Sequence, residues 1–109
     1  DAHLVLVDNP VQHPRGDFVL RADGTVSDED DASRLTYAGV GVYRPAILDG
    51  WREVIGATEG ASANPPQFGL APLMRHAMAN GRVTGQHHQG KWTDVGTPER
   101  LAALDATLA

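Results

Sequence analysis

The residues best suited to chemistry lie in one short segment, residues 92–97 (WTDVGT). We expect a strand over 91–95, which puts Asp94 at the end of an apolar strand, before a glycine turn and a helix start. Ligands of open α/β sheets bind at such strand ends. A carboxylate there can hold Mg²⁺, which prefers oxygen ligands and keeps phosphates as partners. The structural alternative is that Asp94 caps the turn by accepting backbone N–H groups, and the residues alone leave both interpretations open.

The other reactive residue types give weaker signals. The five histidines are His3, His13, His76, His87 and His88. The last two are neighbours in a predicted strand, so their side chains point to opposite faces and cannot share a metal without a bulge. None of the five has the spacing and supporting carboxylate of a zinc site. The chain has no cysteine, no Gly-x-Ser-x-Gly and no phosphate-cradling glycine loop, which argues against thiolate, serine-hydrolase and P-loop chemistry.

Two glycines mark a second place of interest. Gly39 and Gly41 lie two apart within residues 35–43, a segment rich in Val, Tyr and Thr that predicts a strand. In a strand both glycines would lie on one face. Glycine weakens a strand, so the pair indicates either a ligand or backbone close above that face or tight packing against a helix. The segment lacks the third glycine of a dinucleotide fingerprint and does not open a helix.

The elements around these residues follow from periodicity and turn chemistry. Strands are expected over 4–7, 35–43 and, as two hairpins, 17–21 with 25–26 and 82–88 with 91–95. Short helical turns are expected within 45–54, a helix with a Phe/Leu/Met core stripe over 68–78 that stops at Asn80-Gly81, and a last helix capped by Thr97. The acidic run 27–33 and the segment 56–66 predict loops. This order predicts an α/β or α+β sheet covered by helices.

Composition bounds the function classes. At 109 residues, with 41% hydrophobic and 21% charged residues, the chain is a globular mixture with one core and too short for two full domains. A net charge of −5 without a basic stripe argues against a nucleic-acid partner, and no segment predicts a membrane span. The absence of cysteine fits a reducing compartment. Because the first residues already predict a buried strand, we expect a piece of a larger protein; a processed terminus or an arbitrary boundary are alternatives.

Residues 90–101 (GKWTDVGTPERL) resemble the C-terminal signature of sugar-1-phosphate nucleotidyltransferases. Similar matches in order and spacing lie at residues 9–10, 13–18, 35–43 and 68–73. The nearest branch is that of the N-acetylmuramate-1-phosphate uridylyltransferases of bacterial cell-wall (peptidoglycan) recycling. The resemblance covers nearly the whole chain, and the W-x-D-V-G-T-x-x-R-L block is fairly specific to the superfamily.

The resemblance implies an α/β fold, part of a mixed, mostly parallel, Rossmann-like sheet flanked by helices. It implies a cytoplasmic transferase that joins a sugar 1-phosphate to a nucleoside triphosphate, here UTP, and releases pyrophosphate. Catalysis would be mainly positioning and charge neutralisation. Asp94 matches the family's catalytic Mg²⁺ ligand, Gly16 the loop glycine whose N–H approaches the sugar, and Asp17, Tyr37 and Gly39 lie on the expected sugar side.

The departures define which part of the family is present. The family's glycine-rich nucleotide loop, its Lys-Pro lysine and its second magnesium aspartate are not among these residues. We therefore expect residues 1–109 to be the C-terminal, sugar-binding half of the domain, inactive without the nucleotide-binding half. The acidic run 28–31 replaces the Glu-Lys-Pro of many relatives, which favours the muramate branch. Such a half should expose an apolar face that packs on the missing half or self-associates. A non-catalytic binding or assembly module that retains the half-fold is the alternative.

Overall fold

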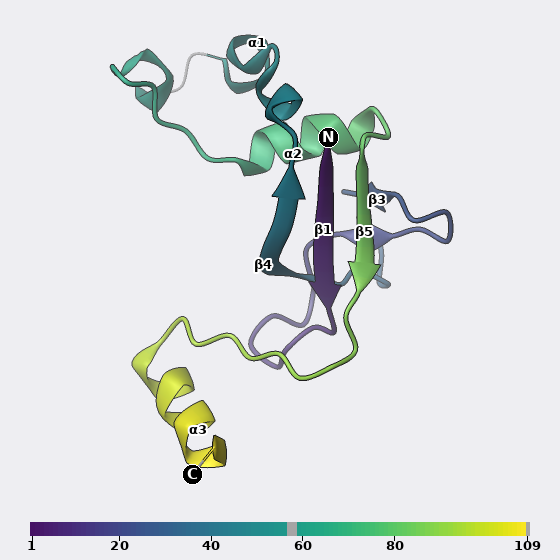
Figure 1. Cartoon of the computed structure of the whole chain (residues 1–109), viewed down its shortest axis with the longest axis vertical. Helices are drawn as coiled ribbons and strands as arrows, with labels where there is room; N and C mark the ends of the chain where they lie inside the picture. Colours follow the sequence, from purple (N-terminus) through teal and green to yellow (C-terminus); the bar gives the residue numbers. More distant parts are fainter. Residues whose placement is uncertain (57–58, 109) are drawn as a thin grey trace.

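The structure is a computed structural model that describes residues 1–56 and 59–108 (Figure 1). Its elements are β1 (Ala2–Val7), β2 (Val19–Leu20), β3 (Val26–Ser27), β4 (Thr36–Tyr43), the 3₁₀ helix η1 (Pro45–Leu48), α1 (Trp51–Ile55), the 3₁₀ helix η2 (Glu59–Ser62), α2 (Ala71–Ala79), β5 (Val83–His87) and α3 (Pro98–Leu108). The central sheet has the order β4-β1-β5, and β2 pairs with β3 in a second, two-stranded sheet. Strand β1 runs antiparallel to β4 and parallel to β5, so the predicted mixed α/β sheet is confirmed.

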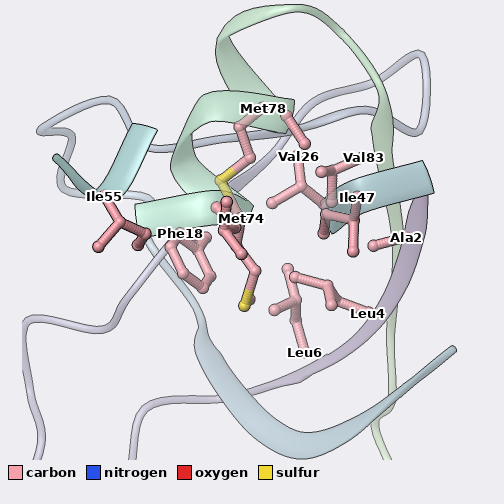
Figure 2. Packing of buried hydrophobic residues seen from close by; sticks show 12 residues of the cluster. Ala2, Leu4, Leu6, Phe18, Val26, Ile47, Ile55, Met74, Met78 and Val83 are labelled. Carbon is pink, nitrogen blue, oxygen red and sulfur yellow. The ribbon is translucent and has the colours of Figure 1, made fainter. Parts of the chain in front are cut away.

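One face of the central sheet carries the core. Alternate residues of β1, Leu4 and Leu6, are fully buried, while Met74 and Met78 of α2 pack into the same cluster (Figure 2). Phe18 joins them from the loop before β2. Each fully buried large side chain contributes roughly 1.5–3 kcal/mol, so this layer holds the sheet and α2 together. The predicted core stripe is confirmed within α2, whose buried residues are Leu73, Met74, Ala77 and Met78. The helix begins at Ala71 rather than at residue 68, and Leu70, also expected in the stripe, is 40% exposed.

Local signals set several element ends as predicted. The β2–β3 hairpin turns at Gly24 (φ +89°), where the Asp23 carboxylate accepts the Thr25 N–H at 2.9 Å. Helix α2 ends at Asn80 and is followed by Gly81 in the left-handed region (φ +68°). Thr97 accepts the Arg100 N–H on its hydroxyl at 3.1 Å and caps α3.

The predicted strand over 91–95 is wrong. Residues 91–96 form an irregular segment between β5 and α3. A second hairpin strand would need the free edge of β5, but that edge is already in use: Thr84 bridges to Thr25, and Gly85 donates its N–H to the Gly24 carbonyl at 3.0 Å. Asp94 therefore lies in a loop and not at a strand end.

The two glycines of β4 do not share a regular strand face either. The pairing passes from Leu4↔Gly41 to Leu6↔Tyr37, so residues 38–40 stand opposite Val5 alone in a bulge. Gly39 takes a left-handed φ of +83° there, and an added Cβ would meet nothing within 4 Å. At Gly41 a Cβ would lie 3.1–3.2 Å from the hydroxyls of two tyrosines and a Leu4 methyl. The close neighbours of Gly41 are side chains of the same sheet, and the alternative of tight packing against a helix is not found at either glycine.

Helix α3 stands apart from the sheet (Figure 1). None of the residues assigned to it is buried, and Leu101 and Leu108 are 55% and 76% exposed. The outward residues of β4 are similar, with Val40 59% and Val42 73% exposed. No helix in the described part of the chain has the length and apolarity that crossing a bilayer requires.

Candidate functional site

A pocket of about 330 Å³ opens where the loop after β1, the bulge of β4 and the segment after β5 meet. Strands β1 and β5 are parallel, so the segments that follow them leave the sheet at the same end. The antiparallel strand β4 begins at that end. The residues that line the pocket are Pro10, His13, Asp17, Thr36, Tyr37, Ala38, Gly39, Trp92 and Asp94. The pocket therefore brings together four of the five site residues named from the sequence, although they lie up to 77 positions apart (94 minus 17).

Asp17 fastens the loop after β1 to the start of β4. One carboxylate oxygen accepts the Tyr37 N–H at 2.9 Å, and the other accepts Nε2–H of His13 at 2.9 Å. Its own N–H donates to the Leu35 carbonyl at 2.7 Å. Asp17 therefore fixes the imidazole of His13 at the pocket wall. Both carboxylate oxygens of Asp17 accept hydrogen bonds from the protein.

Gly16 does not line the pocket. It is buried with φ +69°, and an added Cβ would lie 2.7 Å from the Asn9 side-chain oxygen and 2.9 Å from the Arg34 carbonyl. Its N–H donates to the His13 carbonyl at 3.4 Å. Asn9 supports the same turn, since its amide donates to the Arg34 carbonyl at 2.8 Å and its oxygen accepts the Thr36 hydroxyl at 2.8 Å. The geometry requires glycine here on steric grounds.

The bulge of β4 holds the opposite wall. Because residues 38–40 leave the regular pairing, the Ala38 carbonyl is free to accept the indole N–H of Trp92 at 3.3 Å. This bond ties the irregular segment after β5 to β4. Next to it, the Tyr37 and Tyr43 hydroxyls are 2.5 Å apart, and burial together with this hydrogen bond raises the pKa of Tyr43. The Tyr43 hydroxyl is therefore neutral at physiological pH.

Asp94 is held by its own turn and by α3. One oxygen accepts the Gly96 N–H at 2.8 Å, and the other pairs with the Arg100 guanidinium at 2.7 Å. The capping geometry considered from the sequence is thus present. The side chain is also 39% exposed at the pocket, and a carboxylate has about four lone-pair sites, so capacity for a cation remains.

The donor chemistry of Asp94 fits Mg²⁺ in part. A half-exposed carboxylate is the ligand type this ion prefers, and it binds through one or two carboxylates plus substrate phosphates. Within residues 1–56 and 59–108 no group of three His, Asp or Glu side chains is placed to hold a metal. Asp94 is thus the chain's candidate ligand, and the remaining oxygens would come from phosphates, water or other residues.

Sequence reasoning missed four contributors to the site: His13, Thr36, Trp92 as a wall anchored to β4, and Arg100. A faint signal existed for two of them. His13 precedes Asp17 by four residues in one loop, and Arg100 stands three residues after the Thr97 cap. Trp92 stands in the W-x-D-V-G-T motif, but neither Trp92 nor Thr36 gave a signal for its place in the pocket wall, because that place depends on where the bulge lies.

Comparisons with known proteins agree with the motif. Over 106 residues the chain is 43% identical to the N-acetylmuramate alpha-1-phosphate uridylyltransferase of Neisseria meningitidis serogroup B. The matched region is 96% of this chain and 41% of that protein. Over 99 residues it is 34% identical to the enzyme of the same name from Caulobacter vibrioides, covering 89% and 36%. No family model matches. The chain spans about two fifths of the length of these relatives. Its resemblance to the N-acetylmuramate-1-phosphate uridylyltransferases among the sugar-1-phosphate nucleotidyltransferases is confirmed over nearly all its residues.

Proposed function

We propose that this chain is the sugar-binding part of a uridylyltransferase that joins N-acetylmuramate 1-phosphate to UTP and releases pyrophosphate. The observation that carries the proposal is the pocket in which the Asp17 loop, the β4 bulge and Asp94 meet. Its size is within the range of small-ligand sites, and its few polar groups are convergent, as ligand orientation requires. The names of the two relatives support uridylyl transfer to N-acetylmuramate 1-phosphate.

In the proposed reaction a phosphate oxygen of the sugar 1-phosphate attacks the α-phosphorus of UTP. The bond from that phosphorus to the bridging oxygen of the β-phosphate breaks, and pyrophosphate leaves. Such transfers depend on positioning and charge neutralisation more than on covalent chemistry. Trp92 and Tyr37 shape the pocket for the sugar, and Asp94, the proposed catalytic residue, would hold Mg²⁺ next to the phosphates. When bound, Mg²⁺ would neutralise phosphate charge.

The rest of the machinery is proposed to lie outside residues 1–109. We assign these residues to the C-terminal half of the catalytic domain and the triphosphate ligands to an N-terminal half. The exposed valines of β4, Val40 and Val42, are suitable for packing against that half or for self-association. The reaction would serve peptidoglycan recycling in the cytoplasm, and the isolated 109-residue chain is expected to be inactive.

The test is pyrophosphate release by the whole protein with UTP, N-acetylmuramate 1-phosphate and Mg²⁺. Asp94→Asn should lower kcat by about a hundred- to a thousand-fold, the usual loss when one electrostatic stabiliser is removed. Asp105→Asn, on the exposed side of α3, is the matched control and should keep wild-type kcat. Chelation of Mg²⁺ should abolish the wild-type rate. An Asp94→Asn enzyme with unchanged kcat would remove this residue from the metal site.

A non-catalytic binding module is the second candidate. It is favoured by one observation, that both oxygens of Asp94 are already engaged by Gly96 and Arg100. Such a module would bind the sugar phosphate in calorimetry without pyrophosphate release by the whole protein, which distinguishes it from the enzyme.

A further inference from the structure

The charges of the pocket are nearly all paired within the protein. Its two carboxylates are Asp17 and Asp94. Asp94 is balanced by the Arg100 guanidinium at 2.7 Å. Asp17 is satisfied by the Tyr37 N–H and by His13. Because both carboxylates have partners within the protein, their negative charges should not strongly repel an anionic ligand.

His13 is different from the other lining residues. Among the described residues that line the pocket, its side chain is the one that can carry a positive charge. Its Nε2–H is committed to Asp17, which fixes the orientation and tautomer of the ring. Its Nδ1 has no hydrogen-bond partner within the described ranges, and the side chain is 44% exposed. The imidazole is thus held in place with one nitrogen left for a ligand.

The neighbouring cations are less suitable. Arg34 donates to the carbonyls of Asp28 and Glu29 at 2.9 and 2.7 Å, so its guanidinium is turned toward the acidic loop. Arg15 lines a different hollow, together with Asp30 and Asp31. Among the described lining residues, His13 is therefore the side chain that can pair directly with an anionic group of a ligand.

We propose that His13 determines specificity for the acidic sugar by binding the carboxylate of its lactyl ether. This inference rests on the proposed function, which assigns the sugar phosphate to the side of Asp94. The carboxylate is the group by which N-acetylmuramate differs from N-acetylglucosamine. In the bound state the protonated imidazole donates Nε2–H to Asp17 and Nδ1–H to the substrate, two charge-assisted hydrogen bonds. Asp17 is a positioning residue, because it acts on the substrate through His13.

The experiment compares two sugar phosphates on the whole protein. Initial rates with N-acetylmuramate 1-phosphate and N-acetylglucosamine 1-phosphate are measured for wild type, His13→Gln and His76→Gln. The last is the matched control, an exposed histidine on α2. His13→Gln should lower the ratio of the two kcat/KM values, acidic over neutral sugar, by about 10- to 100-fold, as expected for a hydrogen bond to a charged group. The loss should arise mainly in KM. His76→Gln should keep the wild-type ratio.

A double-mutant cycle tests the role of Asp17. Asp17→Asn should lower the ratio less than His13→Gln does, and the double variant should be no more impaired than His13→Gln alone, because the two residues act as one unit. Thermal unfolding of each variant separates loss of folding from loss of specificity. Calorimetry with both sugar phosphates gives the same ratio from affinities if the neutral sugar is not turned over.

The outcomes are separable. If the wild type neither binds nor transfers uridylyl to N-acetylmuramate 1-phosphate, the proposed function fails and this inference with it. If the wild type is active and His13→Gln weakens both sugars equally or neither, the proposed function stands and the assignment of His13 is overturned. A selective loss for the acidic sugar supports both.

Discussion

The core layer and the C-terminal segment of this chain are built in opposite ways. The layer of β1, β5 and α2 is held by buried apolar side chains, with Leu4, Leu73 and Val83 at 0–1% exposure. The segment from residue 91 to the end of α3 has no buried residue among those described, and polar contacts such as Trp92–Ala38 and Asp94–Arg100 hold it. The residue with the strongest catalytic motif thus lies in the region with the least packing, so fold and site respond to different substitutions.

The largest loss of stability should come from truncating a buried side chain in the core layer. Leu4→Ala removes a fully buried side chain from the middle of β1 and should lower the free energy of unfolding by about 2–5 kcal/mol. Chemical denaturation of the protein measures this loss. The matched control is Leu101→Ala in α3. Leu101 is 55% exposed, so this substitution should change the free energy of unfolding by less than about 0.5 kcal/mol. Equal losses would mean that the two regions are not built differently.

A smaller effect is expected where the core meets the pocket. Gly16→Ala forces a Cβ to within 2.9 Å of two groups in a left-handed conformation, which should cost about 1–3 kcal/mol of stability. The displaced loop carries His13 and Asp17, so affinity for the sugar phosphate should fall as well. Gly24→Ala, where a Cβ would meet nothing within 4 Å despite φ +89°, isolates the cost of backbone conformation alone. If both variants lose the same stability, the contacts of Gly16 with Asn9 and Arg34 do not matter.

The smallest effect should be confined to the C-terminal segment. Thr97→Ala removes the hydroxyl that caps the first turn of α3 and should destabilise this helix by about 1 kcal/mol. Amide hydrogen exchange should quicken in α3 and stay unchanged in β1 and α2. Thr97→Ser, which keeps the hydroxyl, should exchange like the wild type. Faster exchange across β1 in Thr97→Ala would show that the segment is coupled to the core.

The same contrast explains what could be predicted from the sequence. The hairpin at Asp23-Gly24, the stop at Asn80-Gly81 and the Thr97 cap depend on neighbours in the chain, and all three are confirmed. The strand expected over 91–95 failed because the edge of β5 is taken by Gly24 and Thr25, a contact between distant segments. The β4 bulge was missed for another reason: a glycine inside a strand often marks a bulge, but the pair Gly39 and Gly41 was interpreted as a sign of a nearby ligand, backbone or helix.

For the candidate site, the sequence indicated which residues to consider but not the contacts that hold them. The resemblance pointed to Gly16, Asp17, Tyr37, Gly39 and Asp94, and all of these except Gly16 line one pocket. It gave no account of how they are held. The clamp of Asp17 on Tyr37 and the indole bond of Trp92 depend on where the loop after β1 and the bulge come to lie. Such contacts follow from tertiary geometry, and no local propensity encodes them.

The bulge of β4 has a consequence for how this pocket can change in evolution. Between Gly41 and Tyr37 the strand advances four positions while β1 advances two, from Leu4 to Leu6. A deletion of two residues within 38–40 would restore one-to-one pairing and leave every buried residue of β1 in place. If the deletion includes Ala38, it also removes the carbonyl that accepts the indole N–H of Trp92. The length of this pocket wall can therefore change by two residues without altering the buried residues of β1.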